Sequence, residues 1–262
     1  MPGRVERGVT FARAEGHDLQ GDLYLPQGPG PHPVLLAVPG GGWRRGDKAQ
    51  LAHWGRFFSK AGVAFFAVDY RRAVTGPIWP KNLEDVSAAL GFLKSEARRL
   101  DIDPGRIGVL GASAGAHLGG LAALNDPAVR LFVGIYGVYD LATHWQADLP
   151  KEAAPGEDPT SRMLGATPPE NPRLYAEASP QQQIGRARGR FDALLVHGDA
   201  DKDVLLQQSA GFAAALQAAG MNAQLLTVPG AGHFWFSQQA PEPGTFSGQI
   251  ADHLVGFVRQ GL

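Results

Sequence analysis

The chain has 262 residues, of which 44% are hydrophobic and 19% are charged, and its formal net charge is −1. This composition is typical of a globular protein with enough apolar residues for a sizeable core. A charge so near zero provides no long-range attraction for nucleic acid or an anionic membrane, and the absence of cysteine excludes disulfides, thiolate nucleophiles and cysteine-ligated zinc. We therefore expect neither nucleic acid nor a membrane among its partners.

Three features of the sequence bear on where in the cell the protein is located. No segment has the length and apolar character of a membrane span, and the first residues lack the apolar stretch of a signal peptide. The absence of cysteine is compatible with a reducing compartment. We expect a cytoplasmic protein, either a monomer or a homodimer.

The first strands precede a glycine-rich loop. Residues 9–25 alternate between apolar and polar side chains around a polar turn, which predicts a hairpin with one buried face. The apolar run Val34–Val38 is typical of a strand covered on both faces by helices. It ends in Pro39-Gly40-Gly41-Gly42-Trp43, and a flexible linker would not begin at a core strand and finish in a tryptophan. We interpret the glycines as an oxyanion hole, whose backbone N–H groups can approach a developing alkoxide.

Strands and helices alternate in the next part of the chain. Helical spacing of apolar residues predicts helices over 51–61 and 82–99, and buried runs predict strands over 63–70 and 106–110. This alternation indicates an α/β fold with a mostly parallel sheet, in which ligands bind at the carboxyl ends of the strands.

The strand at 106–110 leads into Gly111-Ala112-Ser113-Ala114-Gly115, and a helical pattern over 116–124 follows. A tight turn between strand and helix lifts Ser113 off the strand end, and the small flanking residues let the two backbones pass closely. A serine hydroxyl needs a base to take its proton, so this interpretation requires a histidine and a carboxylate elsewhere. A phosphate loop is the alternative, but the chain lacks the Gly-Lys-Ser/Thr and Gly-x-Gly-x-x-Gly patterns.

After a strand at 129–136 the pattern changes. Residues 141–190 lose the strand periodicity and are rich in Pro, Glu and Gln, and the stretch is too long for an ordinary connection. We predict a small helical lid inserted into one domain that spans residues 1–262. The elements expected after the lid are a strand at 191–198, a helix at 207–220, a strand at 224–228 and a closing helix at 249–260.

The required base and acid lie downstream of Ser113. Among eight histidines, His233 alone lies on a glycine-rich loop directly after a predicted strand, beyond an acidic cluster. The order serine, acid, histidine is the order of an α/β-hydrolase sheet. Asp199, Asp201 and Asp203 all compete for the role of the acid, and their spacing does not decide among them.

Two other histidines have simpler interpretations. His197 ends a predicted strand, where a histidine most often has structural hydrogen bonds. His117 lies one turn into the helix after Ser113, and we expect it to pack or to form a local hydrogen bond.

The whole constellation resembles the α/β-hydrolase superfamily, specifically the carboxylesterases close to the hormone-sensitive lipase group and the bacterial feruloyl and acetyl esterases. Their His-Gly-Gly-Gly-Trp motif is similar to residues 39–43, their Gly-x-Ser-Ala-Gly elbow to residues 111–115, and their His-Gly-x-x-Asp-x-x-Val segment to residues 197–204. The resemblance implies an α/β-hydrolase fold, and it places the acid of the triad on Asp201.

One position departs from the pattern of these esterases. Pro39 stands where they have a histidine that holds the loop through backbone hydrogen bonds. Proline fixes φ and cannot donate a hydrogen bond, so the loop must be held by its own rigidity or by Trp43.

These residues together predict acyl transfer from a small-molecule ester to water, without metal or cofactor. His233 would remove the proton of Ser113, Ser113 would attack the ester carbonyl, and Asp201 would orient the imidazole and stabilise its cation. The backbone donors expected to hold the oxyanion are those of Gly41, Gly42 and Ala114, with Gly40 as an alternative donor. The aromatic side chains expected to line the substrate pocket are Trp43, Trp145, Phe234 and Trp235.

Such a pocket suits a short acyl group or a phenolic ester such as a hydroxycinnamate, while the alternative for most of these aromatics is the core. Two other functions remain open. A formamidase of the kynurenine-formamidase kind uses a similar Gly-Gly-x-Trp loop, and a hydrolase-fold binding protein would keep the pocket without chemistry.

Overall fold

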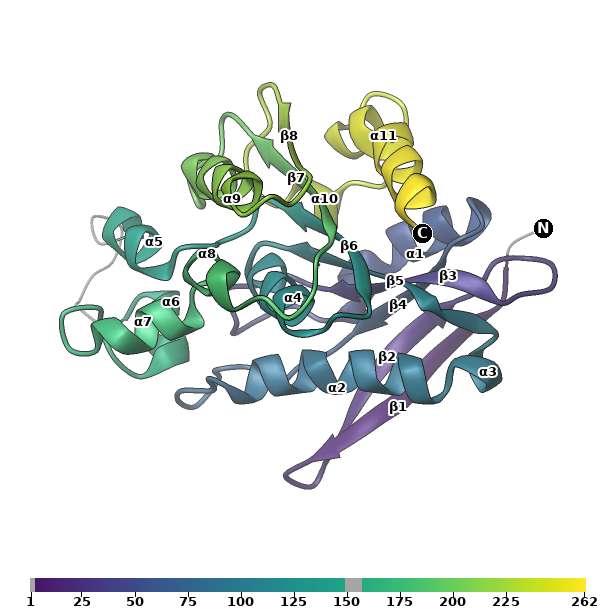
Figure 1. The fold of residues 1–262 in the computed structure, drawn as a ribbon, viewed down its shortest axis with the longest axis horizontal. Helices are drawn as coiled ribbons and strands as arrows, with labels where there is room; N and C mark the ends of the chain where they lie inside the picture. The colour runs from purple at the N-terminus through teal and green to yellow at the C-terminus, as the bar shows by residue number, and fades with distance from the viewer. Residues whose placement is uncertain (1–2, 149–156) are drawn as a thin grey trace.

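The computed structural model describes residues 3–148 and 157–262, and these residues form an eight-stranded sheet in the order β1-β2-β4-β3-β5-β6-β7-β8 (Figure 1). The strands are β1 (Val5–Ala14), β2 (His17–Tyr24), β3 (His32–Val38), β4 (Ala64–Val68), β5 (Ile102–Ala112), β6 (Val129–Ile135), β7 (Asp192–Gly198) and β8 (Ala223–Val228).

The sheet is mixed and mostly parallel. Strands β3 to β8 all run in one direction, whereas β1 and β2 form an antiparallel hairpin that joins the sheet through the antiparallel pairing of β2 with β4. The predicted parallel sheet and the predicted hairpin are both confirmed. Because β3, β5, β7 and β8 are parallel, the loops that follow them emerge at the same edge of the sheet.

Helices cover both faces of the sheet. One face packs against α1 (Ala52–Lys60) and α11 (Phe246–Gly261), and the other packs against α2 (Lys81–Ser95), α4 (Ala114–Asn125) and α9 (Gln207–Ala218). In β3, Leu35 and Ala37 belong to the first core while Val34, Leu36 and Val38 belong to the second. Successive side chains of a strand point to opposite faces, so a strand with two dry faces must be apolar throughout.

The boundaries of β5 and α2 differ from the predicted ones. The strand predicted at 106–110 extends over β5, because its start pairs with the start of β3 at His32 and Ile102. The helix predicted to reach residue 99 ends at Ser95, and a separate turn, α3 (Ala97–Leu100), follows it. That turn ends at Asp101 in the left-handed conformation, with φ of 57°.

The segment between β6 and β7 is helical where it is described. It contains α5 (Leu141–Asp148), α6 (Pro159–Leu164), α7 (Pro172–Ala178), α8 (Pro180–Gln183) and the 3-10 turn η3 (Ile184–Arg186), and part of the predicted lid, residues 149–156, lies outside the described residues. Figure 1 shows α5, α6 and α7 gathered at one end of the molecule. Among the described residues, the remaining helical elements are η1 (Lys48–Leu51) and α10 (Trp235–Gln238).

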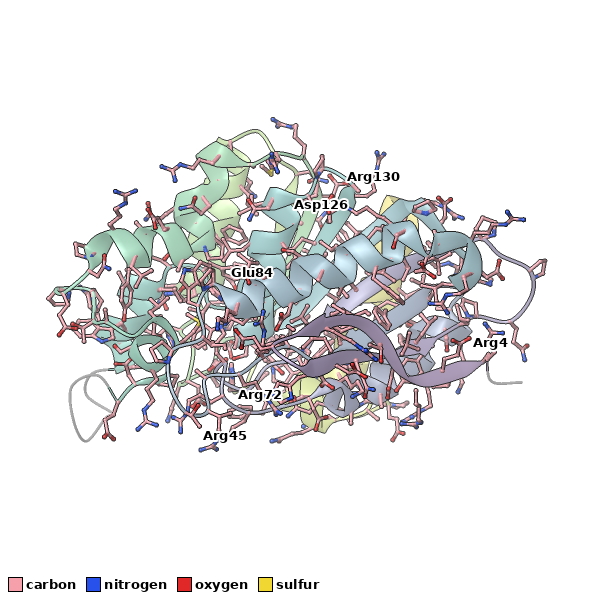
Figure 2. The ribbon with its side chains drawn as sticks, turned by 90° about the horizontal axis from the view of Figure 1, so that it is seen from below. Arg4, Arg45, Arg72, Glu84, Asp126 and Arg130 are labelled. Atoms are coloured by element: carbon pink, nitrogen blue, oxygen red, sulfur yellow. The ribbon has the colours of Figure 1, made fainter. Side chains whose placement is uncertain are left out.

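The surface carries charges of both signs. Figure 2 shows labelled basic side chains (Arg4, Arg45, Arg72 and Arg130) and acidic ones (Glu84 and Asp126) spread over one view of the molecule. Across the two described stretches, no helix has both the length and the apolar character that crossing a bilayer requires.

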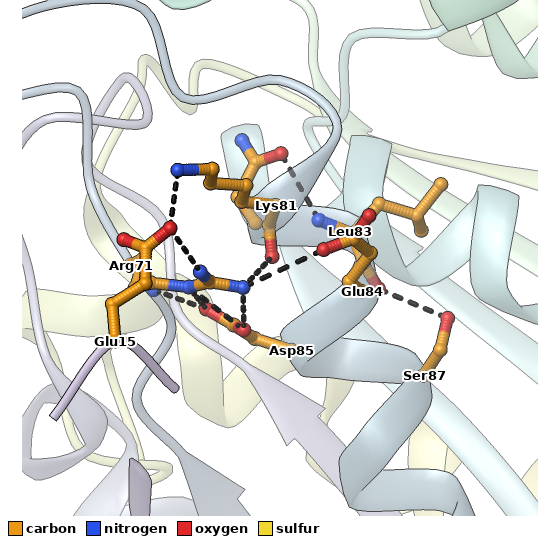
Figure 3. Close-up of polar contacts among 8 residues, drawn as sticks. Glu15, Arg71, Lys81, Leu83, Glu84, Asp85 and Ser87 are labelled. Carbon is orange, nitrogen blue, oxygen red and sulfur yellow. Dashed lines mark hydrogen bonds and ion pairs between the residues drawn. The ribbon is translucent and has the colours of Figure 1, made fainter. Parts of the chain in front are cut away.

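A buried ion pair ties the chain after β4 to α2 (Figure 3). Asp85 on α2 has a side chain only 1% exposed, and it accepts hydrogen bonds from the Arg71 backbone N–H at 2.8 Å and from the Arg71 guanidinium at 2.7 and 3.0 Å. Arg71 also lies near Glu15 and Glu84 and donates to the carbonyl of Lys81. These contacts fix the chain at Arg71, directly before residues 72 and 73, to α2.

We predict that Asp85→Ala lowers the free energy of unfolding by about 3 kcal/mol, because it leaves the Arg71 guanidinium partly buried without its main partner. Glu84→Ala is the matched control, since Glu84 lies 3.6 Å from the same guanidinium but is 61% exposed, and it should cost less than about 1 kcal/mol. Urea unfolding of both variants measures the difference. Equal losses would contradict this account of the pair.

Candidate active site

The turn between β5 and α4 places Ser113 at the edge of the sheet where the parallel strands end. Ser113 has φ of 53° and ψ of −122°, a backbone conformation that non-glycine residues rarely adopt. A Cβ on Gly111 would lie 2.3 Å from the Gly115 carbonyl oxygen, and one on Gly115 would lie 2.2 Å from the Val38 carbonyl oxygen. The expectation that small residues let the two backbones pass closely is therefore confirmed.

Loops after two other strands bring His233 and Asp201 to Ser113. Asp201 follows β7 and His233 follows β8. His233 Nε2 lies 3.0 Å from Ser113 Oγ, and His233 Nδ1 lies 2.6 Å from Asp201 Oδ2. The two competing aspartates lie elsewhere: Asp199 accepts from the backbone N–H of Gly230, and Asp203 lines the pocket described below.

The carboxyl group of Asp201 is held in its ionised form. Burial alone would raise its pKa, but hydrogen bonds from His197 and His233, the charge of His233 and the backbone N–H of Val204 lower the pKa below its usual value. An ionised carboxylate only accepts hydrogen bonds, so His233 donates from Nδ1 and its Nε2 is free to accept the proton of Ser113. This is the tautomer that a general base needs.

His197 supports the same carboxylate. Its Nε2 donates to the Val204 carbonyl oxygen at 2.9 Å and lies 3.4 Å from Asp201 Oδ2, while its Nδ1 accepts from the Ser209 hydroxyl at 2.8 Å. We predicted a structural histidine at position 197 but not its contact with Asp201. The spacing of four residues between His197 and Asp201, at the end of a strand, was the available signal.

The glycine-rich loop lines the same cavity as Ser113. Gly41, Gly42 and Ala114 line this cavity together with Ser113. Within residues 3–148 and 157–262, no hydrogen-bond acceptor is found for the backbone N–H of Gly41, Gly42 or Ala114. Gly41 needs to be glycine, because its φ is 124° and a Cβ would lie 2.3 Å from the Arg45 carbonyl oxygen.

Hydrogen bonds from elsewhere hold the loop despite the proline at position 39. The Tyr70 hydroxyl donates to the Pro39 carbonyl oxygen at 3.2 Å, and the Ala73 N–H donates to the Trp43 carbonyl oxygen at 2.9 Å. The Trp43 indole N–H donates to Nδ1 of His117 at 3.1 Å. Pro39 thus serves as an acceptor for Tyr70 in the chain after β4, and Trp43 both accepts from the Ala73 backbone and donates to His117 on α4.

The cavity in front of Ser113 has a volume of about 500 Å³. Of the four aromatic side chains expected to line it, Trp43 and Phe234 do. Trp235 is instead buried against Tyr136 and Phe246, and Trp145 packs on the core from α5. Trp235 is therefore a core residue, which was the alternative interpretation of these aromatic side chains, because α10 turns its ring toward α11.

The cavity is more polar than the sequence indicated. The charged or titratable side chains that line it, besides His233, are Arg44, Arg45, His144, Asp148 and Asp203. His144 and Asp148 are both buried, one turn apart on α5, with Nε2 and Oδ2 separated by 3.3 Å. Their i, i+4 spacing, within the segment interpreted as a lid, was the signal that could have marked them. Among the described residues, no cluster of three or more His, Cys, Asp or Glu side chains could hold a metal ion.

Comparison with known proteins identifies the family. A profile of the BD-FAE family matches residues 21–216, which is most of the chain and includes Ser113 and Asp201. The chain belongs to the BD-FAE family. His233 lies beyond the matched BD-FAE residues, and the fold alone brings it to Ser113.

Relatives of this BD-FAE chain are esterases by name. It is 33% identical over 221 residues to esterase LipC of Mycobacterium tuberculosis, covering 78% of this chain and 53% of that protein. It is 26% identical over 279 residues to the isoprenylcysteine alpha-carbonyl methylesterase ICME of Arabidopsis thaliana, covering 97% of this chain and 62% of that protein. The chain spans about half the length of the first curated relatives it matches.

Solved structures show the same fold. A truncated carbohydrate esterase from gut microbiota superposes with a TM-score of 0.82 at 25% identity, covering 99% of this chain and 96% of that one. The carboxyl esterase 2 of Tuber melanosporum gives a TM-score of 0.82 at 22% identity, covering 100% and 88% of the two chains. The sheet order and these matches establish the predicted α/β-hydrolase fold for this BD-FAE member.

His117, which contacts the glycine-rich loop, makes stability depend on pH. Burial, reinforced by the charge of nearby His144 and opposed by the hydrogen bond to Ala178, lowers its pKa from 6.5 to about 4. The unfolded chain therefore binds a proton between these pH values that the folded chain does not, and stability falls as the pH drops through this window.

We predict that wild type loses on the order of 2–3 kcal/mol of unfolding free energy through this group between pH 6.5 and a pH just above 4. His117→Asn cannot titrate there and should show a shallower dependence. Urea unfolding of both proteins across the window gives the two slopes. Parallel slopes would show that His117 is not the buried neutral group described.

Proposed function

We propose that this chain hydrolyses carboxylic esters through a covalent acyl-enzyme formed on Ser113. The single observation that carries the proposal is the continuous hydrogen-bonded relay from Asp201 through His233 to Ser113, at 2.6 and 3.0 Å. This arrangement supplies a nucleophile, a base in the required tautomer and a group that orients the base. Membership of the BD-FAE family and the names of the relatives support the same activity.

The reaction follows from the atoms in place. His233 Nε2 takes the Ser113 proton as Oγ attacks the ester carbonyl, and the imidazolium is stabilised by the Asp201 carboxylate. The carbonyl oxygen becomes an alkoxide, which the free amides of Gly41, Gly42 and Ala114 stabilise. His233 then gives its proton to the departing alkoxide, and the same steps with water as the nucleophile release the acid and restore Ser113.

The substrate we propose is an ester with a short acyl group or an aryl acyl group of the hydroxycinnamate kind. A cavity of about 500 Å³ accommodates a small ester, and the Phe234 side chain, which is 44% exposed, offers an apolar face at this cavity. The polar wall made by His144 and Asp148 suits a substrate with hydroxyl groups more than a long alkyl chain.

A series of p-nitrophenyl esters from acetate to decanoate tests this proposal. Wild type should hydrolyse the short esters fastest, with a decline as the chain outgrows the cavity. Ser113→Ala should lower kcat by a factor on the order of 10⁶ without changing the unfolding transition. Turnover by Ser113→Ala at the wild-type rate would overturn the mechanism, and a preference for an N-formyl amide over esters would favour a formamidase.

Asp201→Asn separates the role of the acid from its packing. The amide would donate to Nδ1 of His233 and leave the proton on Nε2, which is the wrong tautomer for a base. We expect kcat to fall on the order of 10⁴-fold with a much smaller change in KM. The matched control is Asp203→Asn, two residues along the same loop, which should retain kcat within a factor of about 10. A larger loss in the control than in Asp201→Asn would reassign the acid.

A further inference from the structure

His117 joins three segments that are far apart in the sequence. It lies on α4, four residues after Ser113, with 0% exposure. Its Nδ1 is 3.1 Å from the indole Nε1 of Trp43 in the glycine-rich loop, and its Nε2 is 2.7 Å from the carbonyl oxygen of Ala178 at the end of α7. The rings of Trp43 and His117 also meet edge to face, with centroids 5.3 Å apart.

The partners determine the proton position on this ring. An indole N–H only donates and a carbonyl oxygen only accepts, so Nδ1 of His117 carries the lone pair and Nε2 carries the hydrogen. Burial favours the same neutral form, because it lowers the pKa of His117 to about 4. The side chain is thus a neutral bridge with one acceptor and one donor, and each is used once.

Trp43 needs such an anchor because of its backbone. Its φ of 57° is in the left-handed region, and it follows Gly42, whose φ is also 57°. The left-handed backbone conformation costs a tryptophan ~1–2 kcal/mol, and surrounding contacts must offset this strain. Its ring is 1% exposed, so the indole N–H cannot turn to water if His117 is lost.

We propose that His117 is a positioning residue that fixes the oxyanion loop, through Trp43, to the helix that carries Ser113. The bridge keeps the amides of Gly41 and Gly42 at a constant separation from the Ser113 hydroxyl, which lies one helical turn away from His117. The inference rests on the proposed function and adds a residue to it. It also explains how the loop is held on the Trp43 side, while Tyr70 holds it at Pro39.

Two amide substitutions at position 117 separate the two halves of the bridge. In His117→Asn the side-chain oxygen takes the place of Nδ1 and can accept from Trp43, whereas the contact with Ala178 is lost. In His117→Gln the side-chain nitrogen reaches the place of Nε2 and can donate to Ala178, whereas the acceptor for Trp43 is lost. Trp43→Phe removes the same hydrogen bond from the other side.

We expect His117→Asn to keep kcat within a factor of about 10, and His117→Gln and Trp43→Phe each to lower kcat on the order of 10²-fold with little change in KM. The double variant Trp43→Phe/His117→Gln should lose no more than either single one, because both remove one interaction. Affinity for a trifluoromethyl ketone, whose hemiketal oxygen occupies the oxyanion position, should fall in parallel with kcat. Equal kcat in the Asn and Gln variants, or a loss confined to KM, would overturn the positioning role.

The hydrogen bond between Trp43 and His117 can also be measured without turnover. Hydrogen exchange at the Trp43 indole, assigned by its loss in Trp43→Phe, should be slow in wild type and His117→Asn and at least about 10-fold faster in His117→Gln. Equally slow exchange in all three proteins would refute the bridge. An inactive wild type with the expected exchange pattern would instead contradict the esterase proposal and leave the bridge standing.

Discussion

The ionised carboxylate of Asp201 is the interaction on which the site depends. It is almost completely buried, and an uncompensated charge there would be neutralised by proton uptake. Two backbone N–H groups, from Asp203 and Val204, donate to one oxygen, and His233 donates to the other with His197 nearby. Because the charge is retained, His233 donates from Nδ1, and its Nε2 is left to accept the hydrogen bond of the Ser113 hydroxyl.

The fold brings these groups together through one geometrical constraint. The glycine-rich loop, Ser113, Asp201 and His233 follow four different parallel strands, and the carboxyl ends of such strands meet at one edge of the sheet. Ser113 and Trp43 both have positive φ angles, so strained backbone is concentrated at this edge. Contacts behind the site hold it there: the Arg71–Asp85 pair anchors the chain next to Tyr70, and Tyr70 holds Pro39.

Much of this could be predicted from the sequence because the signals are local. Alternating apolar runs and helical spacing indicated the parallel sheet, the Gly-x-Ser-x-Gly turn indicated Ser113, and chain order selected His233. Contacts between distant segments carry no such signal. The bond between Trp43 and His117 is such a contact and depends on packing. The four-residue spacings of His197 with Asp201 and of His144 with Asp148 were local signals, but they do not show which group or cavity these side chains face. Nor does an apolar ring reveal whether it faces a cavity or the core, as Trp235 shows.

The central claim is that Ser113 is a nucleophile activated by His233. Reaction with a p-nitrophenyl phosphonate, followed by intact-mass and peptide analysis, tests it most directly, because the phosphonate transfers to an activated serine and stays there. We expect one adduct per chain, located on Ser113, and an adduct that forms far more slowly in His233→Ala. An adduct on another residue, or labelling of Ser113 at an unchanged rate in His233→Ala, would contradict it.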